Sequence, residues 1–316
     1  MSRPAPGAER PGRIDAKPVR HPGRWVAVAV IAVVLGMLLS SFLTNSRWEF
    51  GLAGQIMIQR PVVDGLVKGT LLGTAGSMLI GVVLGILVAV MRLSGNPVLR
   101  GVSFGYTWFF RAVPRYVLLV IIGTGIGYLY STFGIGIPFA QQVADGLGRN
   151  VDLTFFDLDT RTVTNGLLGG IIGLGLSEAA YMAEIARAGI LSVDQGQAEA
   201  ALAIGMSRGK AMRRVILPQA MRVIVPPTGN ETIAMVKDTS LLVAIPVITE
   251  LNYQTSAIGS RLFKIMPALV ASTAWYLLIC SVLMVGQYYL ERHFGRGFGQ
   301  KPRNRRFARP GGMGGA

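Results

Sequence analysis

The chain has almost no cysteine or histidine. Its one cysteine, Cys280, lies inside an apolar run, so an intramolecular disulfide is excluded. The two histidines, His21 and His293, lie in basic end segments and match no ligand spacing. Because so few side chains that bind metals are available, we expect no metal site and no bound cofactor.

Acidic residues are also scarce, with 16 Asp and Glu against 31 Lys and Arg and a formal net charge of +15. Such a charge would fit nucleic-acid binding, but the basic residues gather in both tails and in the segments after the second and fourth apolar runs. With six spans and both tails inside, every basic segment falls on the cytoplasmic side, the positive-inside pattern. The charge therefore predicts a membrane orientation and no nucleic-acid partner.

Long apolar runs are abundant, with 51% hydrophobic residues and a mean hydropathy of +0.48. A membrane-spanning helix needs about 20 predominantly apolar residues. We expect six spans, at about residues 25–44, 67–91, 101–130, 165–188, 223–247 and 267–290. A cleaved signal peptide is the rival interpretation of the first. That run is longer than a signal peptide requires and no small-residue cleavage site follows, so an anchor is favoured.

Glycine is frequent, at 41 residues, and it follows helical spacing within the spans. Gly69 and Gly73, then Gly81 and Gly85, form two small-xxx-small pairs in the second span. Such pairs let another helix approach closely. The fourth span is also rich in glycine, which predicts tight packing between helices.

Charges at membrane depth are costly, so each is a hypothesis about function. The polar candidates for a substrate pathway are Arg111, Pro114, Glu178, Tyr181, Asn230, Glu231, Lys237 and Asp238. For Arg111, Lys237 and Asp238, a structural role in neutralising other charges remains open. Glu178 and Glu231 have no obvious balancing cation on their own helices, which favours a polar pathway. Glu184 and Arg187 are three residues apart and predict an intrahelical ion pair.

A polar segment, "EAALAIGMSRGKAMRRVILP", follows the fourth span. Asp194 can cap a helix, with Gln197 completing a capping-box-like pattern, and Gly205 can end it. A basic second helix would follow and close at Pro218, and Pro226 and Pro227 would start span five. The spacing predicts two short cytoplasmic helices. A helix lying on anionic lipid is the alternative.

The same segment resembles the EAA loop of importer-type ABC permeases. Gly205 follows Glu199 by six residues and Leu217–Pro218 follow by 18 and 19. The stretches "FFRAVP", "AAYMAEIARAGILSVDQGQAEAALAIGMS" and "RRVILPQAMRVIVPPTGNETIAMVKDTSL" are similar to the polar amino acid permeases of the histidine, glutamate, glutamine and arginine group. The resemblance covers about residues 60–295 and is most specific at 178–241. Arg115 and Tyr116 depart from it, since the family tends to carry aliphatic residues after the proline.

The resemblance implies a permease subunit of an ATP-driven importer for polar amino acids in the bacterial cytoplasmic membrane. Its ATPase-coupling residues would be Glu199, Ala200, Ala201, Gly205, Leu217 and Pro218. The implied partners are two ABC ATPase subunits, a second permease protomer, an extracytoplasmic amino-acid-binding protein and membrane lipid. Which amino acid is carried, and whether the permease pair is homo- or heteromeric, stays open.

We expect no nucleotide site in this chain. The nearest approach to a P-loop, "GMSRGKA" at residues 205–211, is one residue short and has Ala where Ser or Thr is required. An ion-coupled secondary transporter that uses Glu178 and Glu231 is the alternative function, and a lipid-binding scaffold is another. The secondary transporter has no need of the 199–218 segment, and the scaffold would not need buried acids.

We therefore expect an all-α integral membrane protein of the type I ABC importer permease kind. Residues 1–24 and 294–316 would be disordered basic cytoplasmic tails. Residues 25–60 would form an extra transmembrane helix and external loop, and residues 61–293 the permease domain with coupling loop 194–222. The long external loop 131–163 has no assigned function.

Overall fold

The computed structural model describes residues 22–136, 146, 154–245 and 247–295. Residues 1–21 and 296–316 of the expected tails, and residues 137–145 and 147–153 of the loop between 131 and 163, lie outside these ranges. The chain divides into two units, residues 1–48 and 49–316. In the first unit, α1 (Pro22–Thr44) is long and apolar enough to cross a membrane and corresponds to the first expected span.

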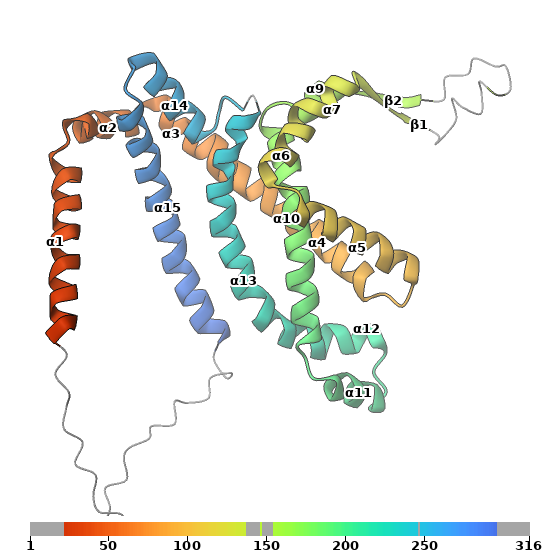
Figure 1. Cartoon of the computed structure of the whole chain (residues 1–316). Helices are drawn as coiled ribbons and strands as arrows, with labels where there is room; N and C mark the ends of the chain where they lie inside the picture. Colours follow the sequence, from red (N-terminus) through yellow and green to blue (C-terminus); the bar gives the residue numbers. More distant parts are fainter. Residues whose placement is uncertain (1–21, 137–145, 147–153, 246, 296–316) are drawn as a thin grey trace, which may run out of the picture. The chain divides into compact units, whose positions relative to one another are not determined.

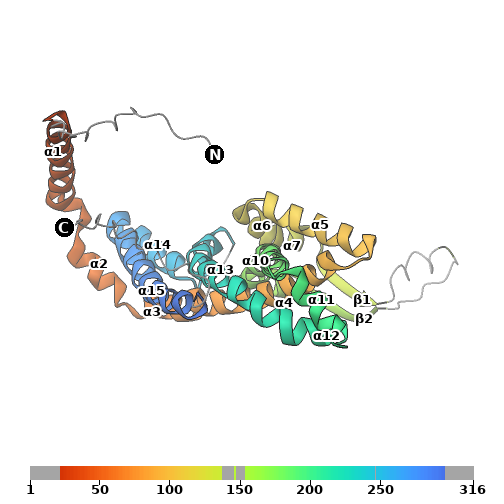
Figure 2. The same cartoon turned by 90° about the horizontal axis from the view of Figure 1, so that it is seen from below.

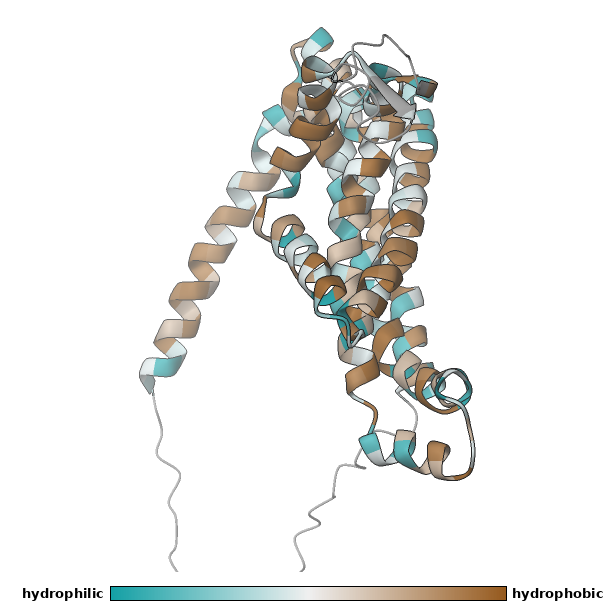
Figure 3. Cartoon of the chain, turned by 90° about the vertical axis from the view of Figure 1, so that its right-hand side faces the viewer, coloured by the Kyte–Doolittle hydropathy of each residue, from teal (hydrophilic) through white to brown (hydrophobic). Residues whose placement is uncertain are grey.

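The second unit consists mostly of helices, as expected (Figure 1). Its elements are α2 (Phe50–Met57), α3 (Arg60–Asp64), α4 (Leu72–Leu93), α5 (Pro97–Ala112), α6 (Arg115–Val120), α7 (Ile126–Leu129), β1 (Thr132–Gly136), β2 (Thr154–Asp159), α9 (Thr160–Thr164), α10 (Gly166–Leu191), α11 (Gln195–Ala203), α12 (Arg208–Ala211), α13 (Leu217–Asp238), α14 (Leu251–Leu262) and α15 (Ile265–Phe294). Figure 3 shows mostly apolar residues along the long helices.

Among the described residues, four helical runs are long and apolar enough to cross a membrane. They are Pro22–Thr44, Arg60–Leu93, Gly166–Leu191 and Ile265–Phe294, and the bent pair α5 and α6–α7 makes a fifth if it counts as one span. The expected span at 223–247 is not among them. Its helix, α13, carries Arg222, Asn230 and Glu231 and ends at Asp238, yet it packs against both α10 and α15.

The expected span at 101–130 was wrong as a single straight helix. It breaks at Val113 and Pro114, and the two halves are bent by 104°. Val113 and Pro114 both adopt extended backbone angles. Proline explains the break, because it lacks an N–H and disfavours helical geometry in the residue before it. Arg115 is consequently the first residue of a new helix.

Glycine packing between α4 and α10 is confirmed. A Cβ on Gly81 would lie 2.6 Å from Glu178 Cγ, and one on Gly85 would lie 2.4 Å from Met182 Cβ. No ordinary side chain tolerates such approaches, so both positions require glycine. Figures 1 and 2 both place α4 beside α10, which fixes Glu178 against its neighbour helix.

The end of α10 leads into α11 and α12, and the chain then passes through a wide π-helical turn at Met212–Ile216 into α13. We expected Pro218 to close a helix. The structure instead places it in the first turn of α13. Pro226 and Pro227 lie inside α13 and do not begin it. The π-helical turn ends two residues before Pro218, whose missing N–H interrupts the regular hydrogen-bond ladder.

A short hairpin lies at the opposite end of the unit from α11 and α12 (Figure 1). Strands β1 and β2 are antiparallel, with Thr132 opposite Asp159 and Ile135 opposite Phe156. The expectation of an all-α chain left no place for these strands. They occupy the flanks of the long loop to which we assigned no function.

Candidate functional site

One arginine connects three acidic residues from two other helices. Arg115, at the start of α6, places Nη2 at 2.9 Å from Glu178 Oε2 on α10 and at 3.9 Å from Glu231 Oε2 on α13. Its Nη1 donates to Asp238 Oδ2, also on α13. Glu231 and Asp238 are seven residues apart, so they lie two turns apart on one face of α13. We call these four residues the acidic cluster.

An apolar core positions the acidic cluster. Leu119 on α6, Leu174 on α10 and Met235 on α13 meet in it, and none is more than 1% exposed. Arg115 lies four residues from Leu119, and Glu178 lies four from Leu174. Asp238 lies three residues from Met235. Because residues three or four apart share a helix face, packing of the core brings the charged side chains together.

The acidic cluster is partly buried, with Glu178 as its fully buried member, and it carries an excess of negative charge. The Glu178 side chain is 0% exposed, against 14% for Arg115, 28% for Glu231 and 29% for Asp238. Three carboxylates around one guanidinium leave a formal charge of −2. Glu178 Oε1 is buried and has no hydrogen-bond partner among the described residues. A buried carboxylate oxygen without a partner is costly, so the cluster has capacity for a further donor.

An aromatic ring completes the site. The Arg115 Cζ lies 4.7 Å from the centre of the Tyr181 ring, and Arg111 Cζ lies 5.5 Å from it. Both distances fall within the range of cation–π contact. Tyr181 follows Glu178 by three residues, so α10 presents the carboxylate and the ring on the same face.

Other predicted pathway residues lie around this cluster. Pro114 occupies the break before α6. Arg111 contacts the Tyr181 ring, and within the described residues it forms no ion pair with a carboxylate. Asn230 and Lys237 are exposed on α13, and Lys237 likewise forms no ion pair with a described residue. Asp238 fits the structural interpretation that we left open, because it neutralises Arg115.

Sequence reasoning missed Arg115. We expected Glu178 and Glu231 to lack a balancing cation because neither α10 nor α13 carries one nearby. The cation comes instead from a third helix. The available signal was that Arg115 departs from the aliphatic pattern of the family, at the position directly after Pro114.

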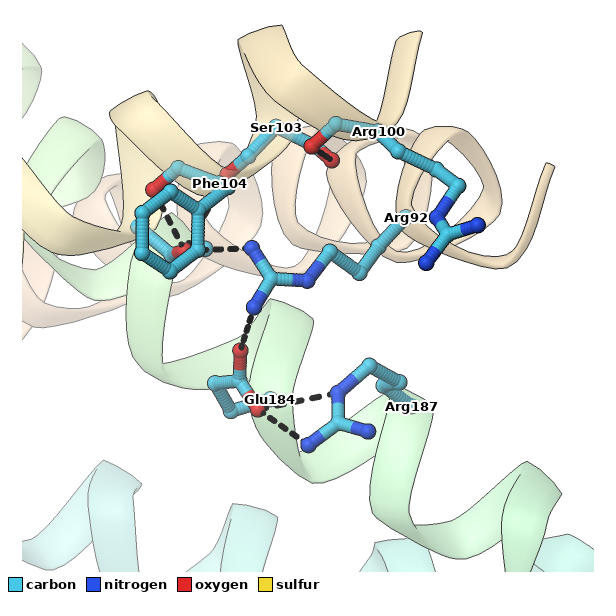
Figure 4. A network of polar contacts seen from close by, with 7 residues as sticks. Arg92, Arg100, Ser103, Phe104, Glu184 and Arg187 are labelled. Atoms are coloured by element: carbon cyan, nitrogen blue, oxygen red, sulfur yellow. Dashed lines mark hydrogen bonds and ion pairs between the residues drawn. The ribbon is translucent and has the colours of Figure 1, made fainter. Parts of the chain in front are cut away.

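A second polar network joins α4, α5 and α10 (Figure 4). The predicted pair of Glu184 and Arg187 is confirmed at 2.8 Å. Arg92, from the last turn of α4, approaches the same carboxylate at 3.9 Å and also donates to Thr107 Oγ1 at 3.4 Å. Its guanidinium lies 4.8 Å from the centre of the Phe104 ring on α5. This network joins α5 to the half of α10 that leads to α11.

A third network, which the sequence did not indicate, surrounds Glu250. Its carboxylate accepts hydrogen bonds from Thr70 Oγ1 at 2.9 Å, Tyr276 Oη at 2.6 Å and the backbone N–H groups of Asn252 and Tyr253 at 2.6 and 3.2 Å. Burial raises the pKa of the Glu250 carboxyl, and these donors oppose the rise. The network ties α14 to α15 and to the π-helical segment Gly65–Leu71, which continues into α4.

The segment predicted to couple to an ATPase forms two short helices. Asp194 Oδ1 accepts from the Gly196 N–H at 2.7 Å and caps α11, although no Gln197 side-chain bond completes a capping box. Gly205 has a φ of +84°. Its N–H reaches Leu202 O at 2.9 Å, and the Met206 N–H reaches Ala201 O at 3.1 Å. This pair of bonds is the Schellman motif, so the predicted helix end at Gly205 is correct.

The coupling candidates differ in exposure. Glu199, Ala200, Gly205, Leu217 and Pro218 are exposed. Ala201 is only 3% exposed, and Ala211 of α12 has the same value. Helix α11 packs against α12 and the following turn. The small Ala201 side chain therefore permits close packing within the segment, and Glu199 and Ala200 are the residues it presents outward.

Residues 81–296 match the family described as binding-protein-dependent transport system inner membrane component. The chain belongs to this family. It is 46% identical over 295 residues to the arginine transport system permease protein ArgU of Corynebacterium glutamicum, covering 92% of this chain and 87% of that protein. It is 34% identical to the L-cystine transport system permease protein TcyB of Bacillus subtilis, over 75% of this chain and 88% of that protein.

Solved structures agree. An amino acid ABC transporter crystallised with histidines matches with a TM-score of 0.58 and 29% identity, over 74% of this chain and 94% of that chain. The MetNI methionine transporter, at 20% identity and a TM-score of 0.52, supports the fold alone. The chain is thus a multi-pass membrane protein and a permease subunit of an ABC importer, as the EAA loop indicated. The secondary-transporter alternative is not favoured.

Proposed function

We propose that this permease carries amino acids with a cationic side chain. The acidic cluster supports the proposal, because its three carboxylates and one guanidinium have a formal charge of −2 and the Tyr181 ring lies beside them. A cargo with a neutral side chain would leave the excess negative charge uncompensated. A guanidinium or ammonium group can bind both the carboxylates and the ring. The name of the relative ArgU points to the same class of cargo.

The proposed transport path passes through the acidic cluster. Glu178 and Glu231 would receive the cationic side chain, and Arg111, beside Tyr181, would receive the α-carboxylate. Both groups are within reach of one amino acid, because Arg111 and Arg115 approach the same Tyr181 ring at 5.5 and 4.7 Å. Asn230 and Lys237 are exposed on α13 and would line the path.

The proposed assembly contains two of these permeases or one with a related partner, two ATPase subunits and an extracytoplasmic binding protein. Both termini would lie in the cytoplasm, because every Lys- and Arg-rich segment then falls inside. The α11–α12 segment would dock on an ATPase subunit and transmit its closure. A capped helix held by a Schellman turn and packed on α12 suits that role, since it moves as a rigid body.

Uptake of labelled amino acids by proteoliposomes tests the cargo. The permease is reconstituted with its ATPase subunit and binding protein, and uptake of L-arginine and L-glutamine is compared with and without ATP inside. We expect ATP-dependent uptake of L-arginine and little uptake of L-glutamine. Uptake that ignores ATP and follows a proton gradient would contradict an ABC importer, and preference for L-glutamine would contradict a cationic cargo.

A charge reversal tests the coupling segment. Glu199→Lys places a cation where the exposed carboxylate would meet the ATPase subunit, so we expect weaker co-purification of that subunit and lower uptake. Gln197→Lys, which introduces the same cation at another exposed position of the same helix, is the control. Membrane insertion should be normal in both. Normal uptake by Glu199→Lys would exclude this residue from the coupling contact.

A further inference from the structure

The acidic cluster already contains a guanidinium group, and it belongs to the chain itself. Resting on the proposed function, we propose that Arg115 is a tethered occupant of the cation site, which a cationic substrate must displace in order to bind. The resting permease would then hold its own arginine side chain where the arginine side chain of the cargo goes. Arg115 would regulate access to the site by competition.

The contacts of Arg115 are those a free guanidinium ligand would make. Nη1 donates to Asp238 and Nη2 to Glu178, so two edges of the planar group each bind a carboxylate. One face approaches the Tyr181 ring at 4.7 Å. Carboxylates at the edges and an aromatic ring at the face are the contacts that guanidinium groups prefer. All three contacts come from α10 and α13, whereas Arg115 comes from α6.

The attachment of Arg115 is suited to withdrawal. Arg115 is the first residue of α6, directly after the extended residues Val113 and Pro114 and the 104° bend. A rotamer change of this long side chain, at the start of the helix, can withdraw the guanidinium while Leu119 keeps α6 packed against α10. A positive charge at a helix start is also opposed by the helix dipole, so α6 itself does not favour this position. The carboxylates of Glu178 and Asp238 and the Tyr181 ring hold the guanidinium there.

The cluster is incompletely satisfied while Arg115 occupies it. Glu178 Oε1 remains buried without a partner, and Glu231 stays at 3.9 Å, beyond hydrogen-bond distance. A substrate guanidinium could first bind Glu178 Oε1 and the Glu231 carboxylate. It could then replace Arg115 at Glu178 Oε2 and at Asp238. Because one guanidinium replaces another, the exchange conserves the contacts of the cluster.

Competition by an internal group makes a directional prediction. When Arg115 occupies the site most of the time, the apparent Kd for substrate equals the intrinsic Kd divided by the fraction of time that the site is free. In proteoliposomes with ATPase subunit and binding protein, Arg115→Met should therefore lower the KM for L-arginine about tenfold if the site is free about one-tenth of the time. A residue that only holds the bundle together would have the opposite effect, raising KM or abolishing uptake.

Arg100→Met is the control, because Arg100 is exposed near the start of α5, on the other side of the 104° bend from Arg115. Should Arg115→Met fold poorly, Arg115→Met combined with Asp238→Asn keeps the cluster at a formal charge of −2. This pair is compared with Asp238→Asn alone. We expect the larger rise in melting temperature on addition of L-arginine when Arg115 is absent.

The outcomes separate the two proposals. If the unaltered importer takes up no L-arginine, the cationic cargo is wrong and the competition falls with it. A second outcome is that the unaltered importer takes up L-arginine, while removal of Arg115 leaves KM unchanged or raises it and leaves the L-arginine-induced melting shift unchanged or reduces it. In that case the cationic cargo stands and the tethered occupant is refuted.

Discussion

Glu231 Oε2 lies 3.9 Å from Arg115 Nη2, an ion-pair distance at which no hydrogen bond forms. Glu231 thus contributes charge to the acidic cluster and leaves the Arg115 guanidinium to Glu178 and Asp238. The loss of its charge should therefore alter what the site attracts more than how the helices hold together.

The substitution Glu231→Gln tests this separation. We expect the stability of the protein to change by less than about 1 kcal/mol, because the pair is partly exposed and no hydrogen bond is lost. Uptake of L-arginine should fall by about tenfold, which corresponds to about 1.4 kcal/mol of lost attraction. Uptake and ATPase-subunit co-purification are measured together. Equal loss of uptake and of co-purification would mean that Glu231 serves assembly of the complex. The control is Glu49→Gln, which removes the exposed ion pair with Lys264.

The contact of Gly85 with Met182 predicts a packing defect. A Cβ at residue 85 would lie 2.4 Å from Met182 Cβ and 3.0 Å from the backbone oxygen of Ala179, so Gly85→Ala must push α4 from α10. Overpacking of this kind costs about 1–3 kcal/mol. Thermal melting in detergent measures it. Gly105→Ala is the control, since nothing lies within 4 Å of that position. Similar melting of the two variants would contradict the tight contact.

Much of the fold could be predicted from local patterns. Glycine spacing indicated the α4–α10 contact, and Asp194 and Gly205 marked both ends of α11, because caps and small residues act within a few positions of the chain. Arg115 could not be predicted in the same way. Its partners lie 63 and 123 residues further along, and only the packing of three helices brings them together.

The break at Pro114 illustrates the same limit. Hydropathy ran on through residues 101–130, and the proline could have kinked a span or ended it. The structure shows two helices bent by 104°. That bend moves Arg115 to a helix start beside α10 and α13, so the acidic cluster depends on geometry that an apolar run does not encode. Glu250 was missed for a similar reason, because Thr70 and Tyr276 are distant in sequence.

The left-handed backbone of Gly205 predicts a conformational requirement in the coupling segment. At a φ of +84°, Gly205→Ala should cost about 1–2 kcal/mol, because a Cβ is strained in that region. We expect faster proteolysis between α11 and α12 and lower ATP-dependent uptake. Gly209→Ala is the matched control, since it lies in α12 with open space around it and no positive φ. Gly205→Asn should be tolerated better than Ala, and equal proteolysis of all three variants would contradict the role of this turn.

The Glu250 carboxylate predicts a stability effect outside the spans. Four donors converge on its two oxygens, including Thr70 Oγ1 and Tyr276 Oη on one of them. Glu250→Gln replaces one acceptor oxygen with an amide donor that faces these donors, so it should destabilise the protein by on the order of 2 kcal/mol, the range for hydrogen bonds to charged groups. Thermal melting of Tyr276→Phe, which removes one donor, should show a smaller loss, and combining the two changes should be less than additive because they share a bond. Tyr288→Phe is the control, with a side chain on the exposed face of α15. Additive losses, or a Glu250→Gln variant that melts like the unaltered protein, would show that this network does not hold α14 to α15.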